Sequence, residues 1–257
     1  MRWFTPFSSL MIGLLVSSLL LIGAPHPAAA QSYLRADMAT LDRAYIAALA
    51  LTSQEKLEPS RKAMAVLVPT WQGFQAKYAR ANQEDPQWAR DFDDVNNRIH
   101  EADAIVAEGT ALLEAHEELE SVRITMMGLR ERNGIEYYVD DLTRFHAPME
   151  AIVLAAKDKT PATFTEADLA TIKEQLPQAQ AIWQRITARE FDQALFGFPE
   201  SKLTALQTGM AAETESLAQL EQALSTGDTQ TIIKRSVGVK PNFAALFMLF
   251  ADFETVS

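Results

Sequence analysis

The spacing of apolar residues constrains the fold of this chain more than any other feature. Between residues 34 and 51, Met38, Leu41, Tyr45 and Leu49 lie three or four positions apart, which places them on one face of an α-helix. The same spacing recurs along the chain, and no stretch shows convincing strand alternation. Only 10 glycines and 11 prolines interrupt the 257 residues. The sequence therefore predicts an all-α protein, an antiparallel bundle of six to eight helices.

Short polar segments predict where the helices end. Thr52 and Glu55 have the spacing of a capping box that opens a second helix. Residues 88–132 form one long helix or two in series, because Gly109 is the only strong breaker there. Asn133 and Gly134 predict a clear stop. Later helices are expected at about 136–157, 165–189 with Thr165 as its cap, 201–224, 229–237 and 240–254.

The last predicted helix, residues 240–254, is apolar on nearly every side. Phe243, Phe247 and Phe250 lie three and four positions apart. Such a helix is usually buried, although a docking surface for a membrane or a partner is the alternative. We expect residues 31–257 to form a single domain, with a possible subdomain division near 158–164.

Residues 1–30 have the parts of a secretory signal peptide. Arg2 supplies the positive end, residues 10–22 are an uncharged and mostly apolar core, and Ala28–Ala30 offer small residues for cleavage. The apolar run is shorter than the roughly 20 residues of a spanning helix. We therefore expect Sec export, cleavage after Ala30, a periplasmic or secreted location, and no stable membrane span afterwards.

Charge and cysteine content narrow the function. The formal net charge is −11, and such a surface repels phosphate backbones, so nucleic acid is not expected as a partner. There is no cysteine, which excludes disulfides, thiolate nucleophiles, Cys-ligated zinc and iron–sulfur clusters. Neither a nucleophile elbow nor a glycine-rich phosphate loop is present. A binding role is therefore favoured over catalysis.

Two His-x-x-x-Glu pairs are the candidate site. EAHEELESVR contains His116 and Glu120, and FHAPMEAIV contains His146 and Glu150. Residues four apart share a helix face, and both pairs fall on or beside an apolar stripe. If the chain folds back tightly at Gly134, the four side chains reach one another. Two imidazoles and two carboxylates suit a transition-metal ion, which we expect to be Zn, Fe, Mn or Cu, bound for uptake, storage or sensing.

Three alternatives stay open from the sequence. Each His/Glu pair can be a plain hydrogen-bonded pair, and Arg123, one turn beyond Glu120, can neutralise Glu120 or Glu150 in place of a metal. The chain can be a metal-free acidic interaction module that engages a protein of the cell envelope. A metal-assisted hydrolase or oxidase would need Glu117 or Glu150 as its base. His100 faces nearly opposite to His116 and is expected at the surface.

Overall fold

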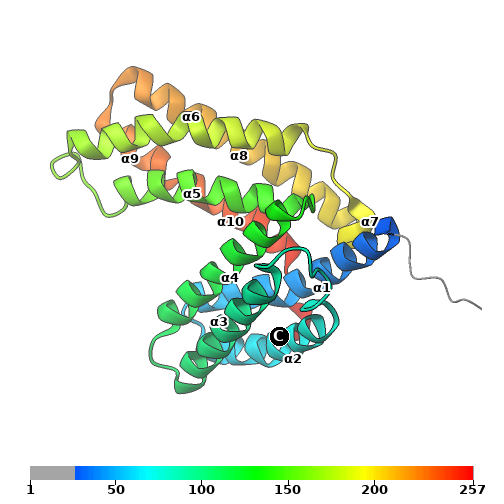
Figure 1. The fold of residues 1–257 in the computed structure, drawn as a ribbon. Coiled ribbons are helices and arrows are strands. Elements are labelled where there is room, and N and C mark those ends of the chain that lie inside the picture. Colours follow the sequence, from blue (N-terminus) through cyan, green and yellow to red (C-terminus); the bar gives the residue numbers. More distant parts are fainter. Residues whose placement is uncertain (1–26, 257) are drawn as a thin grey trace, which may run out of the picture.

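The computed structural model describes residues 27–256, which form α-helices, short 3₁₀ turns and their connections (Figure 1). That part of the chain contains no β-strand, so the prediction of an all-α antiparallel bundle is confirmed. The elements are α1 (Pro27–Ser53), α2 (Leu57–Tyr78), α3 (Trp88–Glu108), α4 (Leu112–Arg132), α5 (Tyr138–Ala156), α6 (Glu166–Ala188), α7 (Gln193–Phe196), α8 (Glu200–Thr226), α9 (Thr229–Val237), α10 (Val239–Phe247), η1 (Met248–Phe250) and η2 (Glu254–Val256).

The first four helices form a four-helix bundle. α1 packs on α2, α2 on α3, α3 on α4 and α4 on α1. Trp71, Phe92 and Trp88 lie in its core, fully or almost fully buried, and the rings of Trp71 and Phe92 stack with centroids 5.5 Å apart. Side chains of this kind contribute roughly 1.5–3 kcal/mol each when they leave water. The apolar stripes that predict the helices thus also hold them together.

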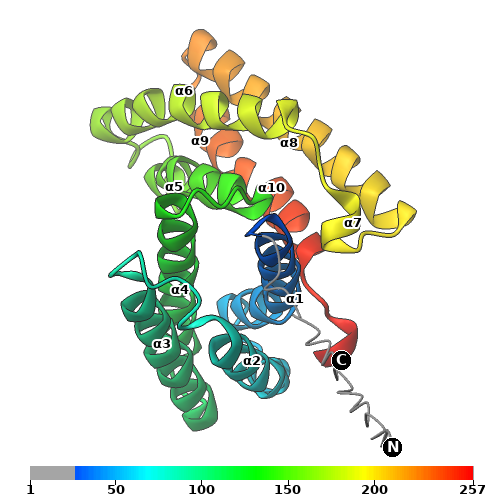
Figure 2. The same ribbon diagram turned by 45° about the vertical axis from the view of Figure 1, so that its right-hand side comes forward.

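The later helices form a second group, which lies above the first in Figure 1. α5 packs along α6, α8 packs along α10, and α9 contacts α5 and α8. Figure 2 shows α10 between α5 and α8. Phe145 of α5 joins the group by contacting Trp183 and Phe243, with ring centroids 4.8 and 5.2 Å away. The two groups meet where α7 and η1 pack on α1 and η2 packs on α2.

Two predicted helix ends are confirmed. Gly109 takes a left-handed conformation, φ 78°, and ends α3, so residues 88–132 are two helices that pack on each other. A Cβ at this position would lie 3.1 Å from the Leu57 side chain, a second reason for glycine. Thr165 caps α6 in a capping box, in which its hydroxyl accepts from the Asp168 backbone N–H and the Asp168 carboxylate accepts from the Thr165 backbone N–H.

The predicted capping box at Thr52 and Glu55 is wrong. Thr52 lies in the last turn of α1, where its buried hydroxyl donates to the carbonyl of Ala48, 2.9 Å away. Glu55 has a positive φ of 52° in the connection, and α2 begins after Lys56. α1 therefore continues two residues further than predicted, to Ser53, and Leu51 and Thr52 are buried in it.

The chain stops at Gly134 as predicted but does not fold back along α4. α4 ends at Arg132 and Gly134 has φ 61°. Ile135 and Tyr137 are then buried, and Tyr137 is extended. The connection therefore leads α5 away from α4 toward α6, α9 and α10 (Figures 1 and 2). Residues of α4 and α5 that are equally far from Gly134 therefore do not lie opposite each other, as they would in a tight hairpin.

The predicted burial of the last helix is confirmed. α10 and η1 cover residues 239–250, and Phe243, Phe247 and Phe250 are at most 8% exposed. Within residues 27–256, no helix combines the length and apolar character needed to cross a membrane. Residues 158–164 connect α5 to α6, which pack along each other, and the domain assignment stays a prediction. The signal-peptide prediction concerns residues 1–30, of which 1–26 lie outside the described residues.

Candidate functional site: a polar pocket between the helix groups

A pocket opens where α1, α4, α5 and α10 meet. It has a volume of about 270 Å³, and the junction of two packed units is a common place for a ligand site. Polar and apolar residues both line it. The polar lining residues are His116, Glu120, Arg123, His146 and Lys240, with Ser53 and Gln54 of the α1 end, and the apolar ones are Leu49, Ala50, Met149, Phe243, Ala244, Phe247 and Met248.

His116 on α4 is anchored to α1. Its Nδ1 lies 3.1 Å from the carbonyl oxygen of Leu49. Because a carbonyl only accepts, we assign the proton to Nδ1, which leaves Nε2 as an acceptor. Nε2 is 3.7 Å from Oε1 of Glu120, beyond hydrogen-bonding distance. The His116 ring is thus fixed on one side and open on the other.

Arg123 occupies the position between the two predicted pairs. Its side chain is 5% exposed, and Nη2 donates both to Glu120 Oε2 and to Nδ1 of His146, the latter 3.0 Å away. Nε is buried without a partner, and Nη1 makes no hydrogen bond with any residue in 27–256. The guanidinium carbon lies 5.9 Å from the ring centroid of Phe247. Arg123, the alternative to a metal ion that the sequence suggests, therefore binds Glu120.

His146 on α5 is held in its neutral form. Burial, followed by the positive charges of Arg123, Lys240 and His116, lowers its pKa to about 3. Since Nδ1 accepts from Arg123, the proton lies on Nε2, which is 4.0 Å from Oε2 of Glu150. At neutral pH His146 is an uncharged acceptor for Arg123.

Glu150 is not one of the residues that line the pocket, although its Oε2 lies 4.0 Å from Nε2 of His146. Both of its carboxylate oxygens accept hydrogen bonds from Nζ of Lys240, at 3.1 and 2.9 Å. The structure thus brings His116, Glu120 and His146 to one pocket, with Arg123 between them. Among residues 27–256, no three His, Asp or Glu side chains are close enough together to hold a metal ion. The four-residue metal site stays a prediction.

Sequence reasoning missed the part of the pocket that comes from α10. Lys240, Phe243 and Phe247 lie about 90 residues beyond the second His-x-x-x-Glu pair, and no spacing rule links them to it. The burial of Phe243 and Phe247 could be predicted, but not what they cover. His100 is exposed on α3, as predicted.

A second polar cluster lies next to the pocket and is closed. Arg130, seven residues after Arg123 on α4, binds Asp140 with three contacts of 2.5 to 3.0 Å, and both side chains are buried. Tyr137 donates to Asp42 at 2.6 Å. Burial raises the pKa of Asp42 to about 6, although the charge of Arg130 opposes this. Asp140, in the first turn of α5, is therefore part of a buried network with Arg130.

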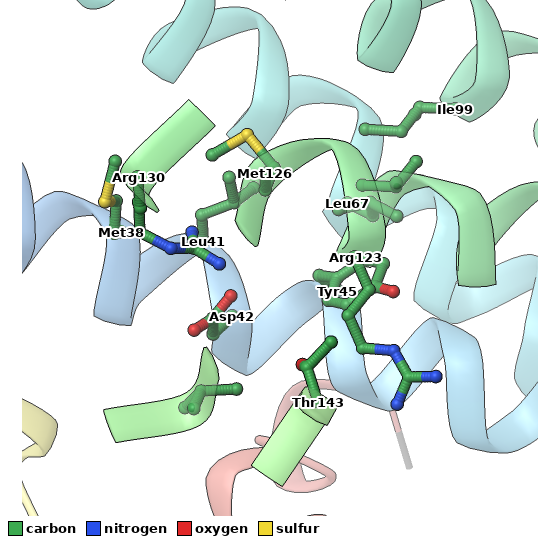
Figure 3. A pocket seen from close by; sticks show the side chains of 12 residues that line it. Met38, Leu41, Asp42, Tyr45, Leu67, Ile99, Arg123, Met126, Arg130 and Thr143 are labelled. Atoms are coloured by element: carbon green, nitrogen blue, oxygen red, sulfur yellow. The ribbon is translucent and has the colours of Figure 1, made fainter. Parts of the chain in front are cut away.

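The guanidinium groups of Arg123 and Arg130 point in different directions. Figure 3 shows Arg130 turned toward Asp42, and Arg123 with its guanidinium turned away from them. The cavity between them measures about 20 Å³, room for roughly one water molecule. The Arg130 cluster is thus a buried structural network, whereas Arg123 faces the larger pocket.

Comparison with protein-family models, with curated proteins and with solved structures found no match for this chain. The geometry of the pocket is the basis for a functional assignment.

Proposed function

We propose that this chain is an exported binding protein that holds a small molecule in the pocket between α1, α4, α5 and α10. The observation that carries the proposal is Arg123, a buried cation that has Nη1 unpaired and lines a mostly apolar pocket. Ligand sites typically combine an apolar wall with a few convergent polar groups. The buried donor of Arg123 that lacks an acceptor is Nε, and such a donor is costly, whereas Nη1 can donate to an acceptor on a ligand.

Binding fits the pocket better than catalysis. His146 and Glu120 both bond Arg123, so neither is free to act as a general base. His116 bonds the Leu49 carbonyl through Nδ1 and keeps only Nε2 as an acceptor. The arrangement of these groups supports recognition of a polar group by fixed donors and acceptors.

The test of the proposal is a thermal-shift screen of residues 31–257 against a small-molecule library. A ligand at 100 times its Kd stabilises by about 2.7 kcal/mol, which shifts Tm by roughly 5–10 °C at this size. Ala244→Phe would fill the pocket and abolish the shift. Ala245→Phe is the matched control, because Ala245 is exposed on the same helix. A screen without any stabilising compound, or a hit that Ala244→Phe leaves unchanged, would overturn the proposal.

Export is the second part of the proposal, and the composition of residues 1–30 supports it. Expression of the full chain in a Gram-negative host, followed by fractionation and amino-terminal sequencing, tests it. A periplasmic or secreted product that begins at Gln31 is the expected result. A cytoplasmic product that retains residue 1 contradicts it.

Metal binding is a second candidate, favoured by the orientation of His116. Histidine ligands usually donate one ring N–H to a carbonyl or carboxylate and bind metal through the other nitrogen, and the Leu49 contact leaves Nε2 in that state. Zn, Fe, Mn or Cu would bind His116, Glu120, His146 and Glu150 only if Arg123 and Lys240 released the carboxylates.

Elemental analysis and zinc titration of the mature protein test this candidate. His116→Ala and His146→Ala are expected to abolish binding, whereas His100→Ala, which removes an exposed histidine on α3, is expected to keep it. Metal at background level in the unaltered protein would end the metal hypothesis. The metal-free acidic interaction module also stays a prediction, for which a pull-down from envelope extract is the test.

A further inference from the structure

We propose that the ligand of this pocket is a small organic monocarboxylate with an apolar body, bound through Arg123. This inference rests on the proposed binding function and names its ligand class. Three features carry it: the unused donors of Arg123, the charges around it, and the apolar wall formed largely by α10.

Two of the five N–H donors of Arg123 are used. Of its three nitrogen atoms, Nη2 serves Glu120 and His146, whereas Nη1 and Nε have no partner in the described chain. A guanidinium presents its donors on separate edges, so one arginine can hold two carboxylates at once. Glu120 and His146 share Nη2, and Arg123 lines a pocket that can deliver a carboxylate to Nη1. A ligand amine would be repelled, and an alcohol oxygen is a weaker acceptor for a charged donor.

The surrounding charges favour one negative charge on the ligand. Lys240 adds a second cation at the rim, but Glu120 and Glu150 already pair with the two cations. His146 is neutral at pH 7, since its pKa is lowered to about 3. A phosphate or dicarboxylate would bring two charges toward two resident carboxylates. A single carboxylate oxygen can accept from Nη1 of Arg123, since Nη2 is already used by Glu120 and His146.

The apolar residues that line the pocket favour a ligand with an apolar body. Phe243 and Phe247 are at most 8% exposed, and they line the pocket with Met149 and Met248. The volume of about 270 Å³ lies below the range of pockets for drug-sized ligands. A short alkyl chain or a single aromatic ring is therefore the expected body.

A series of compounds with one body and different head groups tests the ligand class. Hexanoate, 1-hexanol, hexylamine and hexyl phosphate are titrated into the mature protein by calorimetry at pH 7, with phenylacetate and phenethylamine as an aromatic pair. We expect hexanoate or phenylacetate to bind at least about tenfold more tightly than the other head groups, the effect of one charge-assisted contact. Equal binding of hexanol, or tighter binding of an amine or phosphate, overturns the inference.

Arginine variants test the contact itself. Arg123→Gln is expected to weaken carboxylate binding by about 10- to 100-fold, and Arg123→Lys to have a smaller effect because it keeps the charge and loses the fork. Arg90→Gln, at an exposed position on α3, is the matched control. Circular dichroism establishes that each variant is folded, and if Arg123→Gln does not fold, the head-group series decides. Unchanged carboxylate affinity in folded Arg123→Gln also overturns the inference.

The two proposals fail in different ways. A library ligand that lacks a carboxylate and is excluded by Ala244→Phe would remove the ligand class but leave the binding function in place. Absence of any ligand, including hexanoate and phenylacetate at millimolar concentration, would remove both.

Discussion

Arg123 of α4 donates from Nη2 to Nδ1 of His146 on α5, 3.0 Å away. The contact requires His146 to be neutral, because a protonated imidazole has no lone pair to accept the hydrogen bond. It also places a permanent positive charge beside the ring. Protonation of His146 would therefore break a bond between the two helix groups and add a repulsion in its place.

The stability of the protein is expected to fall in acid because of His146. Its pKa is about 3 in the folded state, against 6.5 for a free imidazole, so the unfolded chain binds the extra proton between these values. The destabilisation caused by His146 is absent above pH 6.5 and grows as the pH drops toward 3, by at most about 1.4 kcal/mol per pH unit. Urea unfolding as a function of pH should give a flatter curve for His146→Gln than for the unaltered protein. His100→Gln, at an exposed histidine, should not flatten it, and parallel curves for all three proteins would contradict the assignment.

Glu213 is expected to lower the stability of the protein as the pH rises, which is the opposite of the effect of His146. It is fully buried on α8, neither carboxylate oxygen has a partner, and burial raises its pKa to about 8 from 4.5. The folded state therefore holds a proton that the unfolded state has lost, and stability falls as the pH rises from 4.5 to 8. Glu213→Gln should remove this fall and stabilise the protein at pH 8 by several kcal/mol, on the order of 1.4 kcal/mol per pH unit.

The control for Glu213 is on the same helix. Glu215→Gln changes an exposed glutamate two residues away and should leave the pH dependence of unfolding as it was. If Glu213→Gln and Glu215→Gln give the same curve, Glu213 is not the buried acid that the structure describes.

Local features of the fold could be predicted from the sequence. The conformation of Gly109 and the cap at Thr165 depend on residues within four positions along the chain, and such rules are visible in a single sequence. The burial of Phe243 follows in the same way from apolar spacing. The capping prediction for Thr52 is wrong because a good cap residue also fits inside a helix when its hydroxyl donates to a carbonyl of the preceding turn. The hydroxyl of Thr52 does so with the carbonyl of Ala48.

The arrangement of the pocket depends on long-range packing and was only half predicted. The structure brings His116, Glu120 and His146 to one pocket, but the path of α5 is determined by its contacts with α6, α9 and α10, not by Gly134. Lys240 reaches Glu150 across 90 residues. Periodicity places a side chain on a face, whereas the identity of the facing residue depends on the whole fold.

The buried pair of Arg130 and Asp140 is expected to matter for stability rather than for binding. Each side chain is at most 5% exposed, and loss of one partner leaves a buried charge, which costs about 3–5 kcal/mol. Asp140→Asn should lower the free energy of unfolding by that order. The comparison is Glu131→Gln, which breaks the more exposed pair with Arg144 and should cost less than about 1 kcal/mol. Equal effects of the two substitutions in urea unfolding would show that the Asp140 pair is not buried as described.

Glu150 distinguishes the two candidate ligands of the pocket. It is paired with Lys240 at the rim, where the lysine side chain is 48% exposed, so Glu150→Gln should change stability by less than about 1 kcal/mol. For a carboxylate ligand, the substitution frees Lys240 and removes a repelling charge, and a gain of roughly 0.5–1 kcal/mol would tighten hexanoate binding about two- to fivefold. For a metal ion, the same change removes a predicted ligand and weakens zinc binding. Calorimetric titration of Glu150→Gln with hexanoate and with zinc therefore gives opposite signs for the two functions, and Lys240→Gln should reverse the sign for hexanoate.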